Sequence, residues 1–211
     1  MKSLIFLGVT TLLTIITVSF TSCEKENNEN NNQSLIPLKT GNKWTYESHQ
    51  GSNSNSIVLE VGEIVNIKGY KGYKFLSGNK PHNSTFIVDN DDNGNFLIVG
   101  GYSDVDSLFS PSINYKYNAR KGESWDYENI HVNYDSGIFD KDLIKVYCIN
   151  TDTMITTPKG TFKCMTFEYS QNAGEDVFRN FVSVSIGMVK SEHYENDNLF
   201  SYMTLTDYLL K

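Results

Sequence analysis

Hydrophobic and polar residues alternate in short runs along most of the chain after residue 35. Ile57, Leu59 and Val61, for example, occupy alternate positions, and a period of two places them on one face of a strand. No stretch of ten or more residues in this region has the 3.6-residue period of a helix, while runs rich in Val, Ile, Phe, Tyr and Thr recur between Gly, Asn and Asp clusters. The pattern predicts an all-β fold with antiparallel strands.

Turn-forming residues set the limits of these runs. Pro158-Lys159-Gly160 and the segment 91–94 have the composition of hairpin turns. The predicted strands are 43–48, 56–67, 70–77, 85–88, 95–99, 124–127, 143–150, 154–157, 161–170, 178–185, 187–194 and 199–208.

An internal repeat adds to this picture. The segments 41–47 and 122–128 share Gly, Trp, Tyr and Glu at the same spacing, and both tryptophans of the chain lie in this pattern. Trp and Tyr two positions apart point to the same face of a strand. We therefore expect two related β units, about 36–110 and 112–211, that merge into one domain over 35–211. Either a strongly curved sheet or a sandwich fits this expectation, with both tryptophans buried.

The N-terminal segment differs in composition from the rest of the chain. Lys2 precedes an uncharged run over 4–20, which is short for a bilayer span and typical of a signal peptide. Small residues then precede Cys23, and the segment resembles the lipobox of bacterial lipoproteins. That resemblance implies a signal peptide over 1–22, cleavage before Cys23 and lipid attachment to its thiol. The alternative is an uncleaved transmembrane anchor in which Cys23 has no role.

The residues directly after Cys23 are rich in Asn and Glu, and a segment with so little to bury has no reason to fold. We expect 23–34 to be a disordered tether. Its acidic residues resemble the signal by which Bacteroidota export lipoproteins to the outer face of the outer membrane. The expected location is the bacterial outer membrane, on its surface-exposed or periplasmic face.

Net charge limits the partners of the protein. The full chain carries a formal charge of −7. Removal of 1–22 takes away one lysine and leaves 17 basic against 25 acidic residues, a net charge of −8. An acidic chain without a Lys/Arg cluster repels both nucleic acid and anionic lipid headgroups. We therefore expect no nucleic-acid partner, and we expect membrane contact only through the lipid anchor.

Two cysteines remain besides Cys23. Cys148 and Cys164 form an even pair in an oxidising compartment, and both are flanked by strand-like residues. A disulfide between them and two buried free thiols both fit the sequence, since spacing alone does not place two Cα atoms within bridging distance.

Three segments carry a family resemblance. The start at 36–46 (IPLKTGNKWTY), the turn region 157–164 (TPKGTFKC) and the segment 186–192 (IGMVKSE) resemble a group of Bacteroidota lipoproteins. Their motifs consist of turn and core residues. The resemblance implies an antiparallel β fold, with a strongly curved sheet like those of lipoprotein carriers. It implies neither an established activity nor functional residues.

Metal and cofactor signatures are weak. The segment 89–95 matches the first half of a calcium loop, but Gly100 occupies the position of the closing acidic ligand, and Asn and Asp also favour plain turns. Four histidines, at 49, 82, 131 and 193, lack the paired spacing of a zinc site. His193, close to Glu192 and Glu195, has the most suggestive neighbours. We expect no metal and no cofactor.

The remaining evidence favours binding over catalysis. The common nucleophile, zinc and nucleotide motifs are absent from the sequence. Thirteen tyrosines and twelve phenylalanines, with clusters at Tyr70, Tyr73 and at Tyr115, Tyr117, favour an aromatic core or binding surface. The sequence predicts a binding or assembly module for a glycan, peptide or lipid. The alternative is a hydrolase that uses paired carboxylates, whose catalytic residues the sequence does not identify.

Overall fold

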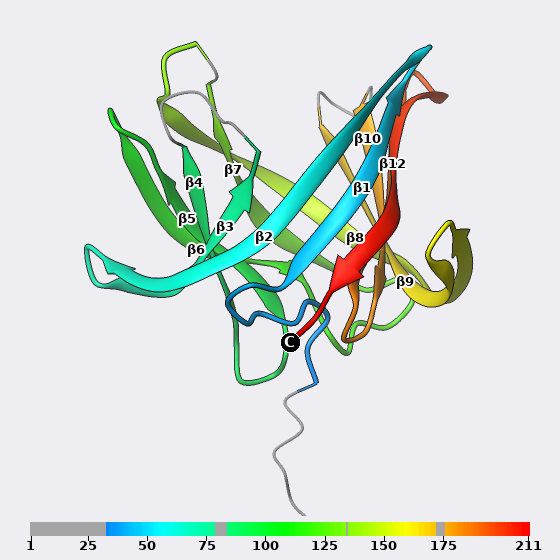
Figure 1. Ribbon diagram of the computed structural model, residues 1–211, viewed down its shortest axis with the longest axis horizontal. Helices are drawn as coiled ribbons and strands as arrows, with labels where there is room; N and C mark the ends of the chain where they lie inside the picture. Colours follow the sequence, from blue (N-terminus) through cyan, green and yellow to red (C-terminus); the bar gives the residue numbers. More distant parts are fainter. Residues whose placement is uncertain (1–32, 79–83, 134, 172–175) are drawn as a thin grey trace, which may run out of the picture. The chain divides into compact units, whose positions relative to one another are not determined.

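β-branched and aromatic residues are frequent in the strands of this protein, and their side chains pack well on a pleated surface. The computed structural model describes residues 33–78, 84–133, 135–171 and 176–211. Within these residues, twelve strands form one antiparallel sheet (Figure 1). The strands are β1 (Lys43–Gln50), β2 (Asn53–Ile67), β3 (Tyr70–Ser77), β4 (Thr85–Asn90), β5 (Phe96–Tyr102), β6 (Ser107–Tyr115), β7 (Ser124–Val132), β8 (Phe139–Thr157), β9 (Gly160–Gln171), β10 (Asp176–Ser183), β11 (Gly187–Glu195) and β12 (Asn198–Leu209).

The chain divides into two units, Met1–Asn31 and Asn32–Lys211, and the sheet belongs to the second. The expected signal peptide over 1–22, Cys23 and most of the expected tether over 23–34 lie outside the described residues. In the part of the chain that the structure describes, no helix is long and apolar enough to span a membrane.

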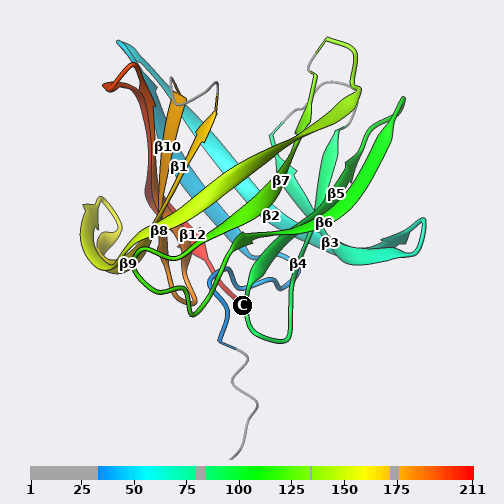
Figure 2. The same cartoon turned by 180° about the vertical axis from the view of Figure 1, so that it is seen from behind.

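The strand order shows how the sheet is built. Strands β1 to β6 and β7 to β12 are two successive meanders, and they join where β1 pairs with β12. The sheet curls until its two edge strands, β6 and β7, approach each other (Figures 1 and 2). The prediction of an all-β antiparallel fold is confirmed, and of the two expected forms, a strongly curved sheet or a sandwich, the structure has the curved sheet.

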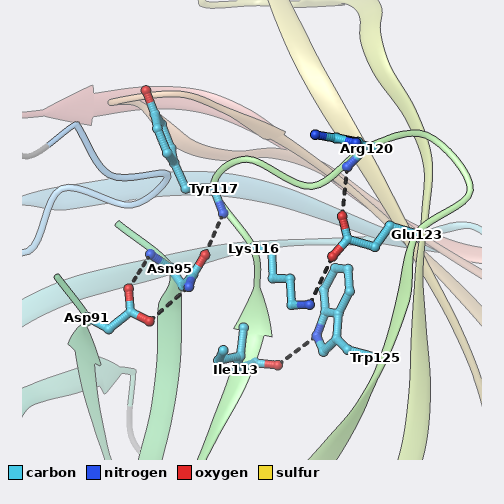
Figure 3. Close-up of polar contacts among 8 residues, drawn as sticks. All are labelled: Asp91, Asn95, Ile113, Lys116, Tyr117, Arg120, Glu123 and Trp125. Carbon is cyan, nitrogen blue, oxygen red and sulfur yellow. Dashed lines mark hydrogen bonds and ion pairs between the residues drawn. The ribbon is translucent and has the colours of Figure 1, made fainter. Parts of the chain in front are cut away.

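Side chains connect the two edges, and no backbone ladder joins β6 to β7 over their described residues. Trp125 Nε1 donates to the carbonyl of Ile113 over 2.9 Å (Figure 3). The amide of Glu128 donates to Ser112 Oγ, also over 2.9 Å. The barrel is therefore nearly closed, with a seam between β6 and β7 that depends on a few side chains.

The main core lies on the concave face of the sheet. Trp44, Tyr46, Trp125 and Tyr127 are all at least 92% buried, with exposed fractions of 1, 2, 8 and 4%. The expected burial of both tryptophans and both tyrosines is confirmed. Trp44 Nε1 donates to the carbonyl of Ile186, between β10 and β11, whereas the carbonyl of Ile113 that accepts from Trp125 lies on β6. The interpretation as two related units stays a prediction.

A second apolar cluster fills the space between β4 to β6 and the β7–β8 hairpin. Its buried members are Ile130, Val132 and Phe139. The ring of Phe139 meets that of Phe86 edge to face, with centroids 5.8 Å apart. A Cβ added at Gly101 would overlap the Phe139 ring, so this close contact requires glycine on β5. The cluster thus packs the β7–β8 hairpin against strands β4, β5 and β6.

Candidate functional site

A small apolar cavity lies on the concave face, within the main core. Its volume is about 170 Å³. Six strands and the segment before β1 contribute its lining: Ile36, Trp44, Tyr46, Leu59, Phe75, Phe96, Ile98, Asn114, Tyr115 and Met188. Most of these side chains are aromatic or aliphatic, and the cavity contains no ionisable carboxylate or amine in its wall.

The few polar groups around the cavity are hydrogen-bonded within the protein. Tyr46 OH donates to the carbonyl of Met188 over 2.9 Å. Asn180, which is 5% exposed, donates through Nδ2 to Tyr115 OH over 2.9 Å. These groups give the cavity fixed dipoles but leave few free donors for a ligand.

Burial also controls the charge state of these tyrosines. It raises the pKa of the Tyr46 and Tyr127 hydroxyls above their ordinary value, because the phenolate form loses its hydration. The pKa of Tyr115 is raised for the same reason, and the neighbouring tyrosines add to the effect. All three hydroxyls therefore stay neutral at physiological pH, so the cavity offers no charge to a polar ligand.

The segment before β1 forms the floor of this cavity. Leu35 and Ile36 are buried, with exposed fractions of 0 and 6%. The carbonyl of Ile36 accepts a hydrogen bond from Asn90 Nδ2 over 2.9 Å. Asn42 is buried too, and it links the segment to the C terminus by donating to the carbonyl of Pro37 and accepting from the amide of Lys211. The floor is thus held by backbone-directed hydrogen bonds at several points.

A second, polar cavity of about 410 Å³ lies beyond this floor. Its wall includes Asp89 to Asp92, which the sequence singled out as half of a calcium loop. Asp91 Oδ1 accepts from the amides of Asn93 and Asn95, and Oδ2 accepts from Asn95 Nδ2. Asn95 in turn accepts from the amide of Tyr117 (Figure 3). The Asp91 carboxylate thus accepts three hydrogen bonds within the turn, an arrangement typical of Asp in turns.

Cys148 and Cys164, for which the sequence allowed either a disulfide or free thiols, are free thiols in the structure, and both are buried. Cys148 belongs to the main core, whereas Cys164 packs with Phe181 and Val189 in a separate cluster. The ladder between β8 and β9 pairs Cys148 with Phe167, so the two thiols are out of register. Burial raises the pKa of Cys164 to about 12. Cys148 and Cys164 are therefore not joined by a disulfide in the structure.

The tyrosine clusters do not form one binding surface. Tyr70 stacks on Phe109 with ring centroids 5.0 Å apart, at the outer end of the β2–β3 hairpin. Tyr73 lines the polar cavity, Tyr115 lines the apolar one, and Tyr117 OH donates to Gln33 Oε1. Tyr70 and Tyr73 are three positions apart on β3 and therefore face opposite sides of the sheet, whereas Tyr117 lies after the end of β6.

The histidines occupy different settings. His49 stacks on Tyr202, and His131 Nδ1 lies 3.7 Å from Asp142 Oδ2. His82 lies outside the described residues. His193 has two carboxylates near its ring, those of Asp176 and Glu195. Glu192, also noted in the sequence, belongs to the other face, where it accepts from Lys190 and Tyr194.

Comparisons with known proteins give a partial match. Residues 114–205 match the model of a family described as DUF3108-like. The chain is similar to a candidate lipoprotein of Parabacteroides distasonis, with 16% identity, a TM-score of 0.45 and coverage of 84% of this chain and 99% of the other. It is also similar to a candidate exported protein with a YmcC-like fold from Bacteroides fragilis, with 14% identity, a TM-score of 0.48 and coverage of 84% and 100%. No curated protein sequence matches.

Proposed function

We propose that this chain is a lipoprotein of the bacterial outer membrane, anchored through Cys23, that binds an apolar ligand such as an acyl chain in the cavity of its curved sheet. The anchor rests on the sequence of the first 23 residues. The ligand class rests on the cavity, which is the observation that supports the proposal most strongly.

The size of the cavity agrees with this ligand class. An apolar protein cavity of about 150 Å³ stays dry and takes up benzene. At about 170 Å³, this cavity has room for a ring or for a short stretch of an acyl chain. A whole lipid is larger, so the remainder of such a ligand extends from the cavity along the concave face.

The chemistry of the lining disfavours the other predicted ligands. Glycans and peptides need hydrogen-bonding partners in the site, because their own polar groups lose water on binding. Here Trp44 Nε1, Tyr46 OH and Tyr115 OH already have partners within the protein. An apolar ligand makes no such demand, and its burial is favourable by about 25 cal/mol per Å² of apolar surface.

Filling the cavity tests the proposal. In Leu59→Trp the larger side chain occupies the cavity, so we expect the affinity for cis-parinaric acid, a fluorescent fatty acid, to fall by about tenfold or more, the loss that corresponds to about 1.4 kcal/mol of binding free energy. The measurement is a fluorescence titration of the full chain purified in detergent.

A matched control lies on the same strand. Val58 precedes Leu59 on β2, faces the other side of the sheet and is 37% exposed. Val58→Trp is therefore expected to bind the fatty acid as the unmodified chain does. Equal affinity in both variants, or no saturable binding by the unmodified chain, would refute the proposed site.

A further inference from the structure

Strands β10 and β11 bring together three side chains that commonly bind metal ions. Asp176 pairs directly with Glu195 across the ladder, and Phe178 pairs with His193. Residues two apart on a strand share a face, so Asp176, His193 and Glu195 all lie on the side of Phe178. The Phe178 ring stacks on Tyr169, which packs against the main core, so this side is the concave face.

Aromatic rings hold the imidazole of His193 in place. Phe178 stacks on it with a centroid distance of 4.2 Å and an interplanar angle of 6°. Phe200 meets its edge at 5.3 Å. The side chain of His193 is only 19% exposed. The orientation of the ring is therefore fixed by packing before any ligand arrives.

The nitrogen that faces the two carboxylates lacks a hydrogen bond. His193 Nε2 is buried and has no hydrogen-bond partner among the described residues. It lies 3.5 Å from Asp176 Oδ1 and 4.0 Å from Glu195 Oε1. A buried polar atom normally has a partner, because its desolvation is costly. Here the neighbouring groups are carboxylate oxygens, and a cation between the three atoms would give the histidine nitrogen a partner.

We propose that Asp176, His193 and Glu195 form a binding site for a divalent transition-metal ion, with zinc as the ion that fits the donor set best. The three ligand atoms lie within 4.8 Å of one another. Two ligands about 2.0–2.1 Å from a tetrahedral zinc ion are about 3.4 Å apart. The observed 3.5 Å between Asp176 Oδ1 and His193 Nε2 matches this spacing, and the 4.0 Å between His193 Nε2 and Glu195 Oε1 is slightly longer.

The donor set also selects the kind of ion. An imidazole nitrogen suits zinc and other transition metals, whereas magnesium and calcium prefer oxygen ligands alone. Three protein ligands leave a further coordination position open, as in sites where zinc binds water or a ligand group. None of the three residues lines the apolar cavity, so the metal site is separate from the proposed fatty-acid site.

Calorimetric titration of the full chain with zinc chloride, after removal of bound metal by a chelator, tests this site. We expect one ion per chain with micromolar or tighter affinity. His193→Gln and Glu195→Gln should each weaken binding by at least about tenfold, the loss observed even for residues that only orient a metal ligand. Because Glu195 is 41% exposed, Glu195→Gln is expected to keep the fold, which its melting temperature checks.

His131→Gln provides the matched control. His131 also lies beside a carboxylate, Asp142, but it belongs to no three-residue cluster among the described residues. Its replacement should leave the zinc affinity unchanged. Replacing zinc by calcium should abolish the calorimetric signal. Absence of saturable zinc binding, or binding that survives both His193→Gln and Glu195→Gln, would overturn the proposal, whatever the outcome of the fatty-acid titration.

Discussion

Replacing Trp44 or Trp125 by alanine is expected to lower the free energy of unfolding by about 3–5 kcal/mol, the range observed for large aromatic residues in protein cores. Trp44 is 1% exposed and packs near Phe75, and its indole NH has a backbone partner. Trp125 is 8% exposed, meets Phe167 edge to face and donates across the seam to Ile113. Each truncation removes a large buried surface and leaves a partly buried carbonyl without its donor.

Urea denaturation of the purified chain measures both effects. Tyr147→Ala is the control, because Tyr147 lies on β8 with 43% of its surface exposed. Its replacement should change the free energy of unfolding by less than about 0.5 kcal/mol, as is usual for surface residues. If both tryptophan variants behaved like this control, the indoles would not anchor the core.

The second large effect concerns the membrane anchor. In Cys23→Ala the thiol that the lipobox resemblance assigns to acylation is absent, so we expect no incorporation of labelled fatty acid and complete loss of membrane retention. The physical reason is that acyl chains contribute about 0.8 kcal/mol per buried CH₂ group, whereas an Asn-rich tether contributes no comparable affinity. Metabolic labelling with a tritiated fatty acid, followed by membrane fractionation, measures both outcomes.

Ser22→Ala is the matched control for this experiment, because it keeps a small residue before the cysteine and leaves the thiol in place. It should incorporate the label and fractionate with membranes. Labelling of the Cys23→Ala chain, or its retention by membranes after the signal peptide has been removed, would contradict the assignment of a lipoprotein.

Strand periodicity was sufficient to predict the fold class, and its two errors have physical causes. The sequence did not predict β6, because Pro111 interrupts the run over Ser107–Tyr115. Proline lacks a backbone donor and is tolerated at the edge of a sheet. In the structure β6 is an edge strand that, among the described strands, pairs only with β5. No described strand pairs with its other side, so the missing amide hydrogen of Pro111 removes no ladder hydrogen bond there.

The other error was the division of β8 into two strands. The polar residues Asn150 to Asp152 suggested a loop, yet β8 continues from Phe139 to Thr157. Its register against β9 shifts on both sides of Asn150. Bulges of this kind accommodate extra residues within one strand, and local composition cannot distinguish them from a turn.

The sites depended on register and curvature, which the sequence does not reveal. His193 and Glu195 were noted as neighbours, but Asp176 joins them only because β10 and β11 pair with these residues opposite each other. The apolar cavity combines side chains from β1, β2, β3, β5, β6 and β11. Such a set comes together only when the sheet curls. The sequence predicted burial of Trp44 but not the space that Trp44 shares with the other lining residues.

The most direct test of the proposed ligand site uses the two tryptophans as reporters. Trp44 lines the cavity and Trp125 does not. Because the chain has only these two tryptophans, Trp125→Phe leaves Trp44 as the single indole and Trp44→Phe leaves Trp125. A dibrominated stearic acid quenches indole fluorescence only at short range, so the measurement compares saturable quenching in the two single-tryptophan chains. A ligand in the cavity predicts clearly stronger quenching of Trp44 than of Trp125. Equal quenching of both, or none of Trp44, would contradict a fatty-acid site in this cavity.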